Sequence, residues 1–206
     1  MAVDEHYNEH GGFPKFETAK VEPEYGELIE ALRRVQDLAV SVDMPADALK
    51  AALAQTQQLV ATMEPHVVPE RKTPAGRVPR LPGRGSLLML PWTVEKFDAD
   101  GVRSRGVFRR FHLGGNGAAH GGTLPLLFDD LFGLTQHAYG RPISRTAYLH
   151  VNYRKITPLN QPLVVEGHVD KVEGRKTFIS ATLKNEDGEL IADSDALMVQ
   201  LLPGQQ

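Results

Sequence analysis

The chain has 206 residues, 41% of them hydrophobic, and a net charge of −3 at pH 7; this length suits one domain with an appendage and not two typical domains. It contains no cysteine, which excludes disulfides, cysteine-ligated zinc, iron–sulfur clusters and a thiol nucleophile. Residues 1–63 hold eleven Asp or Glu against five Lys or Arg, a charge of −6 that leaves +3 for the remainder, and an acidic N-terminal part argues against nucleic-acid binding.

No stretch of the sequence has the character of a membrane segment or a secretion signal. The longest apolar runs are a handful of residues, as from Leu87 to Leu90, whereas a membrane-spanning helix needs about 20. The N-terminus has no basic region followed by an apolar one, which a secretory signal would have. We therefore expect no membrane insertion and a cytoplasmic location.

The first 85 residues indicate an arm, two helices and a linker. Residues 1–23 show no apolar periodicity. Apolar residues then recur at helical spacing over 25–40 and over 46–63, which predicts two helices that form an antiparallel pair. Five prolines and five basic residues follow, and this composition is typical of an extended connection. The predicted parts are an arm and helical extension over 1–70, a Pro/Arg-rich linker over 71–85, and a single folded domain over 86–206.

From Ser86 onward the pattern is that of two strands, one helix and a strand meander. The expected strands lie near 87–97, 102–112, 145–156, 162–173, 176–186 and 189–201, with the helix near 122–139. Glycine-containing turns separate the last strands and no helix lies between them, so antiparallel pairing is expected. The fold class is therefore α+β, with one apolar helix packed on the concave face of an antiparallel sheet.

The glycine-rich segment before this helix is the part of the chain best suited to chemistry. It runs from Gly114 to Thr123 and includes a His-Gly-Gly turn. The unpaired N–H groups and the dipole of the helix that follows favour an anion or an oxyanion at this point. On that helix, Asp129 lies about 155° from the centre of the apolar stripe, and Asp130 about 105°. Asp129 is thus expected to face away from the sheet, toward solvent or a second subunit.

The His-Gly-Gly turn with an acid nine positions after the histidine resembles the hotdog-fold acyl-CoA thioesterases of the phenylacetate-type (PaaI-like) superfamily. The similarity continues in the segment that starts at Thr146 and in the turns at Gly174 and Gly188, and it covers roughly residues 86–202. The resemblance implies the hotdog fold, hydrolysis of acyl-CoA to a free acid and CoA, and no cofactor, because CoA is part of the substrate. It also implies a homodimer or a tetramer.

The resemblance assigns roles to individual residues. Asp129 would be the general base or the nucleophile. The Gly121 N–H would form the oxyanion hole, and His120 would position the turn. Thr146 of the neighbouring subunit would orient the attacking water or the carboxylate, although it could also be an ordinary strand residue. Asp130 is expected to be structural.

The chain departs from the family pattern at one position. Many relatives carry Asn or Gln six positions before the histidine, where this chain has Gly114. Either Asn116 provides the second polar contact to the substrate or that contact is absent.

Several glycines and basic residues are candidates for holding the CoA part of the substrate. These are Gly122, Arg154, Lys155, Gly174, Arg175 and Lys176. The four charges could equally form an ordinary solvated face. The histidines lack the spacing of a metal site, so no metal is expected.

Two other functions deserve comparison with hydrolysis. A hotdog domain can act as a non-catalytic acyl-CoA sensor or regulator, here coupled to the N-terminal helices, but their acidic balance opposes DNA binding. An acyl-CoA dehydratase on the same fold would carry a different His/acid signature, which the sequence lacks, and a fold alone does not fix the reaction.

Overall fold

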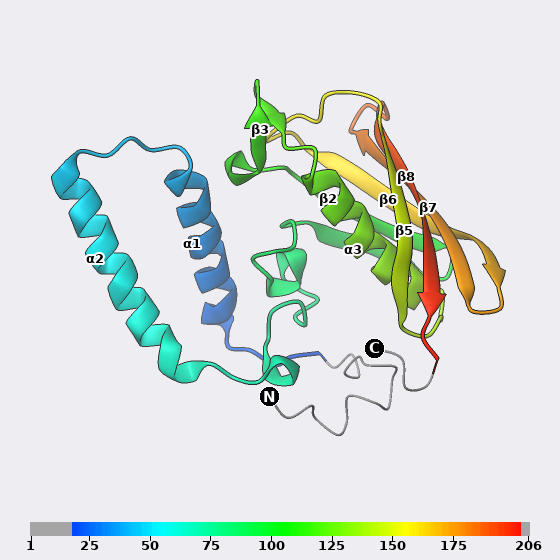
Figure 1. Ribbon diagram of the computed structural model, residues 1–206, viewed down its shortest axis with the longest axis horizontal. Helices are drawn as coiled ribbons and strands as arrows, with labels where there is room; N and C mark the ends of the chain where they lie inside the picture. Colours follow the sequence, from blue (N-terminus) through cyan, green and yellow to red (C-terminus); the bar gives the residue numbers. More distant parts are fainter. Residues whose placement is uncertain (1–17, 203–206) are drawn as a thin grey trace.

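The computed structural model describes residues 18–202, which form a helical extension, a linker and a helix-on-sheet domain (Figure 1). Residues 1–17 and 203–206 lie outside the described part, and most of the predicted arm falls there. Within residues 18–202, no helix combines the length and the apolar character that crossing a membrane requires.

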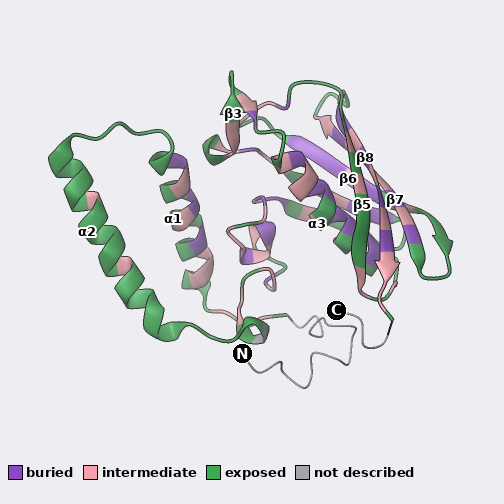
Figure 2. Cartoon of the chain, in the orientation of Figure 1, coloured by how far each residue is buried: buried purple, intermediate pink, exposed green. Residues whose placement is uncertain are grey.

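Both helices of the extension form where the sequence predicts them. α1 covers Pro23–Ala39 and α2 covers Ala46–Met63. α1 turns one face toward the domain and buries Ile29, Arg33 and Asp37, whereas no residue of α2 is buried (Figure 2). The buried face of α1 points to the domain and not to α2. The expected pairing of the two helices therefore does not bury the apolar stripe of α2.

The segment from α2 through the predicted linker, residues 64–85, contains short 3-10 turns and is not one extended crossing. These turns are η2 (Glu64–His66), η3 (Glu70–Lys72) and η4 (Pro82–Gly85). In η4 the backbone is left-handed at Gly83, Arg84 and Gly85, with φ of 56°, 53° and 78°. Glycine tolerates this conformation, but arginine disfavours it, so contacts of the Arg84 side chain must compensate. The domain boundary at 71–85 stays a prediction.

Six strands form one antiparallel sheet in the order β1-β2-β6-β7-β8-β5. The strands are β1 (Thr93–Asp98), β2 (Gly101–Gly106), β5 (Ser144–Tyr153), β6 (Leu163–Glu173), β7 (Lys176–Asn185) and β8 (Leu190–Gln200). The last four agree with the prediction, and each begins and ends within about three residues of the expected position. The first two are shorter than predicted.

Trp92 lies where β1 begins and packs where β2 ends. Its side chain is buried and packs edge-on against Phe108, with ring centroids 5.6 Å apart. The indole also lies directly on Gly106, where an added Cβ would come within 2.4 Å of the ring. The ring therefore covers one face of the sheet at the end of β2. Residues 87–92 stay outside the sheet, and a 3-10 turn, η5 (Arg110–His112), follows β2.

The long helix α3 (Thr123–Ala138) lies across the sheet (Figure 1) and supplies much of the core, as predicted. Its fully buried side chains include Leu124, Phe128, Leu131 and Phe132. Gly167 on β6 allows this close approach, because an added Cβ would come within 3.0 Å of the Leu131 side chain. The predicted α+β architecture is confirmed, and it leaves the opposite face of α3 outside the core.

Candidate active site

A small hairpin that the sequence analysis missed precedes α3. β3 (Leu113–Gly115) pairs with β4 (Ala118–Ala119). Between them, Asn116 and Gly117 have positive φ of 49° and 76°, which is the conformation that Asn-Gly adopts in a two-residue hairpin. The Asn-Gly pair was therefore the available signal. The turn conformation alone explains why asparagine suits position 116. A contact between Asn116 and the substrate stays a prediction.

The hairpin also explains the departure at Gly114. An added Cβ at this position would lie 2.6 Å from the Cα of His120, closer than real Cβ atoms come to backbone. An asparagine or glutamine therefore cannot stand here without displacing the His-Gly-Gly turn. In this chain the first hairpin strand packs directly on the backbone of His120.

The His-Gly-Gly turn is held by its own histidine. The Gly122 N–H donates to Nδ1 of His120 at 3.0 Å, so this nitrogen carries no proton in the bonded state. The His120 N–H donates to the His112 carbonyl at 2.7 Å. The sequence-based interpretation of His120 as a residue that positions the turn agrees with these contacts.

Gly121 lies at the exposed centre of this turn. Its carbonyl accepts a hydrogen bond from the Tyr153 hydroxyl at 2.8 Å, a contact that the sequence analysis did not anticipate. Its N–H has no hydrogen-bond partner within residues 18–202. An added Cβ at Gly121 would meet nothing closer than 3.7 Å. The turn therefore presents a fixed and unpaired donor at the start of α3.

Asp129 lies on the exposed face of α3, as predicted. The Thr146 hydroxyl donates to its Oδ1 at 2.8 Å. The pairing of β5 with β8 is irregular between Thr146 and Tyr148, and a bulge of this kind redirects a side chain. The two residues belong to one chain, so the expectation that Asp129 receives its threonine from a neighbouring subunit is wrong. The edge strand β5 already lies beside α3.

Asp130 has a different environment from its neighbour. Arg84 of the linker binds it through both guanidinium nitrogens, at 3.0 and 2.5 Å, and both side chains are largely buried. This bidentate pair holds the left-handed η4 turn against α3. The expectation of a structural role for Asp130 agrees with these contacts.

The unpaired Gly121 N–H and the Asp129 carboxylate lie at different levels of α3. Gly122 is the N-cap of this helix, and seven residues separate it from Asp129. At a rise of 1.5 Å per residue, this corresponds to roughly 10 Å along the axis. Both groups would have to lie about 3 Å from one thioester carbonyl. Within one chain, about two helical turns therefore separate the Gly121 turn from Asp129 along α3.

The four candidate basic residues fall into two separate pairs. Arg154 binds Asp193 and Lys155 binds Glu189 at one end of β8. The side-chain hydrogen bond from Arg154 lowers the pKa of Asp193, so this acid is ionised. Arg175 donates to the Gln200 carbonyl at the other end of β8, and Lys176 pairs with Val199. Within one chain the four residues thus form no single phosphate site.

The remaining candidates lie in turns. Gly122 donates to His120, as described above, and the Gly174 carbonyl accepts from Arg141 at 2.6 Å. In residues 18–202 no group of three or more His, Asp or Glu lies together in a way that could hold a metal ion.

Sequence comparisons point to one group of enzymes. A family model described as Thioesterase superfamily matches residues 116–192. The chain is 35% identical over 94 residues to Acyl-coenzyme A thioesterase THEM4 of Rattus norvegicus and 28% identical over 86 residues to Acyl-coenzyme A thioesterase THEM5 of Homo sapiens. These matches cover 45% and 41% of this chain but only 40% and 34% of the relatives. The chain thus spans less than half the length of the curated relatives it matches.

Solved structures extend the likeness to the whole described chain. A crystal structure of a thioesterase superfamily protein matches with a TM-score of 0.76 and 25% identity, over 89% of this chain and 94% of that one. A hypothetical thioesterase from Streptococcus pneumoniae TIGR4, solved with coenzyme A, matches with a TM-score of 0.50 and 23% identity, over 54% and 91%. The second likeness concerns the fold alone. The predicted hotdog fold is confirmed.

Proposed function

Because residues 116–192 belong to the thioesterase superfamily, we propose that this protein hydrolyses the thioester of an acyl-coenzyme A to the free acid and CoA. The curated relatives named above are acyl-coenzyme A thioesterases, and one structural neighbour was solved with coenzyme A. The observation that carries the proposal is the exposed Asp129 carboxylate with its Thr146 hydrogen bond of 2.8 Å.

Asp129 drives the reaction in this proposal. The hydroxyl of Thr146 occupies one carboxylate oxygen and fixes the orientation of the group. The second oxygen is then available to take a proton from water, which attacks the carbonyl carbon, or to attack that carbon itself. Direct attack expels the CoA thiolate and leaves a mixed anhydride of Asp129 and the acyl group, which water then hydrolyses. In H₂¹⁸O, attack of water on the Asp129 carbonyl of this anhydride leaves ¹⁸O in the protein and an Asp129 oxygen in the product acid, so label in the protein after one turnover identifies the direct route. The general-base route places the label in the acid.

The Gly121 N–H serves as the oxyanion hole. The carbonyl oxygen becomes anionic when the carbonyl carbon is attacked, before the thiolate leaves. A fixed donor at a helix N-terminus stabilises that charge without reorganisation. The Tyr153 and His120 contacts support this role, because they fix both polar groups of the peptide that follows Gly121: Tyr153 binds its carbonyl, and His120 binds its N–H, which belongs to Gly122. This peptide is next to the one that carries the Gly121 N–H.

The active form is a homodimer in this proposal. The separation of roughly 10 Å along α3 between its N-cap, Gly122, and Asp129 supports a composite site. One chain contributes Asp129 and Thr146, and its partner contributes the Gly121 turn. A two-fold axis makes two identical sites of this kind. Assembly of dimers into a tetramer, phosphate binding by the basic residues, and the cytoplasmic location stay predictions from the sequence.

A hydrolysis screen tests the proposed function. Purified protein is incubated with acyl-CoA esters of short, long and aromatic acyl groups, and the released thiol is measured. We expect turnover of at least one ester, and we expect Asp129→Asn to abolish most of it while the variant still binds CoA. An absence of hydrolysis for every ester, together with retained binding, would favour the non-catalytic sensor.

A further inference from the structure

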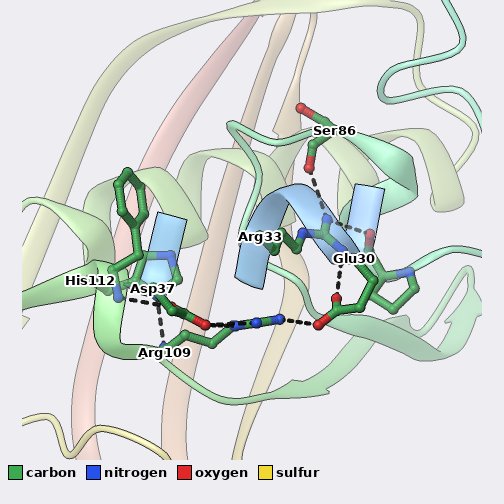
Figure 3. A network of polar contacts seen from close by, with 8 residues as sticks. Glu30, Arg33, Asp37, Ser86, Arg109 and His112 are labelled. Atoms are coloured by element: carbon green, nitrogen blue, oxygen red, sulfur yellow. Dashed lines mark hydrogen bonds and ion pairs between the residues drawn. The ribbon is translucent and has the colours of Figure 1, made fainter. Parts of the chain in front are cut away.

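The extension contributes two nearly buried charges to the hotdog domain. Arg33 and Asp37 of α1 are 4% and 6% exposed. Buried charges are costly unless they are paired, and both are paired here, as Figure 3 shows. Arg33 donates to the carbonyls of Pro82 and Ser86 in the linker, at 2.8 and 2.9 Å. The partners of Asp37 lie instead in the domain.

Asp37 holds the η5 turn from two sides. Its Oδ2 accepts from the Arg109 guanidinium at 2.7 Å, and its Oδ1 accepts from the Phe111 backbone N–H at 3.0 Å. Arg109 makes a second ion pair with Glu30 at 2.6 Å. Glu30 does not touch the backbone of η5, and its side chain is 57% exposed. The two carboxylates thus share one guanidinium, but only Asp37 fixes the turn.

The η5 turn is bonded directly to the catalytic turn. The Arg109 N–H donates to Nδ1 of His112 at 2.8 Å, which stiffens η5 internally. The His112 carbonyl then accepts the His120 N–H at 2.7 Å. His120 immediately precedes Gly121. Two hydrogen bonds therefore connect α1 to His120 through the chain segment Phe111–His112. The first joins Asp37 to the Phe111 N–H, and the second joins the His112 carbonyl to the His120 N–H.

We propose that Asp37 is a positioning residue for the Gly121 oxyanion donor, so that the N-terminal extension is part of the catalytic apparatus. The inference rests on the proposed function. An ion pair of this kind contributes little net stability compared with apolar packing, but it fixes the direction of groups around it. A donor whose position must be correct to within a few tenths of an ångström benefits from such fixation. The residue lies far outside the matched segment 116–192.

Matched variants test the proposal. Asp37→Ala and Glu30→Ala each remove one carboxylate from Arg109, but only the first frees the Phe111 N–H. Deleting an oxyanion donor costs about 100- to 1000-fold in kcat, and displacement of the donor removes part of that. We expect Asp37→Ala to lower kcat roughly tenfold with KM within about twofold, and Glu30→Ala to leave both within about twofold. All assays are run below the melting temperature of each variant. Equal kcat values for the two variants would overturn the proposal.

A second measurement does not depend on activity. Asp37→Asn keeps the size and one acceptor oxygen, and therefore serves if the alanine variant fails to fold. In ¹H–¹⁵N spectra, we expect the amide resonance of Gly121 to move in Asp37→Asn and to stay in place in Glu30→Gln. An unchanged Gly121 resonance in both variants refutes the connection. If the wild-type protein hydrolyses no acyl-CoA but the resonance moves, the proposed function fails while the structural connection holds.

Discussion

Asp129 and Asp130 are adjacent on α3, yet their side chains face two different regions of the molecule. Asp130 faces the linker, where Arg84 satisfies both of its oxygens. Asp129 faces outward, where a single hydroxyl binds one oxygen. The same contrast recurs at Gly121, whose carbonyl is bonded while its N–H has no partner among the described residues.

The contrast shows how a residue type acquires its role. A carboxylate whose two oxygens are both bound by one guanidinium is suited to holding structure, because water or substrate has to compete with that ion pair. A carboxylate that is oriented but incompletely bonded is available for water or substrate. The two environments therefore separate the structural from the chemical carboxylate on α3. The first two predictions below test that division, and two more compare other pairs of residues.

The largest effect is expected at Asp129. Asp129→Asn should lower kcat by about 100-fold or more, because a positioned base contributes roughly that much. Its melting temperature should stay close to that of the wild type, since the residue is exposed. Asp130→Asn should do the reverse. It breaks a largely buried bidentate pair and should cost about 1–3 kcal/mol of unfolding free energy, with turnover nearly unchanged. Similar kinetics for the two variants would contradict the division.

The second prediction concerns mixed dimers of two inactive variants. Gly121→Pro removes the proposed donor, and Gly121→Ala, which retains the N–H, is its control. Asp129→Asn and Gly121→Pro chains, unfolded and refolded together, should regain activity. One site of each mixed dimer then has both residues intact, so each mixed dimer reaches at most about half the wild-type rate.

The companion mixture should not recover. Asp129 and Thr146 belong to the same chain at one site, so mixing Asp129→Asn with Thr146→Ala leaves one defect in every site. Its activity should equal the average of the two parents. Recovery in this mixture, or none in the first, would show that the composite site is assembled differently.

The third prediction compares the two N-terminal helices. Ile29 on α1 is 7% exposed, whereas Leu53 on α2 is 56% exposed. Ile29→Ala should lower the unfolding free energy by about 2–4 kcal/mol, and Leu53→Ala should change it by less than about 0.5 kcal/mol. Denaturant titrations at two protein concentrations measure both. A large Leu53 effect that grows with concentration would mean that a second copy covers α2.

These comparisons also explain what the sequence could and could not predict. Periodicity predicted α3, the last four strands and the outward direction of Asp129, because such patterns depend on local geometry. It could not predict where β1 begins and β2 ends, since the packing of Trp92 on Phe108 and Gly106 at this place is a tertiary contact. The partner of Asp129 came from the resemblance and not from a pattern: the resemblance placed Thr146 in a neighbouring subunit, whereas the structure shows the contact within one chain.

Long-range polar contacts were the least predictable feature. Asp37 and Arg109 are 72 positions apart, and Tyr153 and Gly121 are 32 positions apart. Nothing in the spacing of these residues indicates a partner. From the sequence, Asp37 in the predicted helix over 25–40 could not be distinguished from a solvated acid. Only the fold shows that it contacts η5.

The last and smallest effect concerns two histidines with the same hydrogen bond. His112 and His120 each accept a backbone N–H at Nδ1, at 2.8 and 3.0 Å. His120 is exposed, but burial lowers the pKa of His112, with Arg109 and Arg33 adding to the shift and Asp37 opposing it. The unfolded chain protonates this ring near pH 6.5, whereas the folded chain resists protonation. The unfolded state therefore binds more protons.

The consequence is a stability that depends on pH with a definite sign. The contribution of His112 is fully present above about pH 6.5 and is lost as the pH falls through its lowered folded-state pKa. His112→Asn retains an acceptor but does not titrate. Between pH 7 and pH 5, denaturant titrations should show the unfolding free energy of the wild type falling more steeply than that of this variant. Parallel profiles would mean that protonated His112 fits the fold as well as the neutral ring, and that η5 does not need its Nδ1 acceptor.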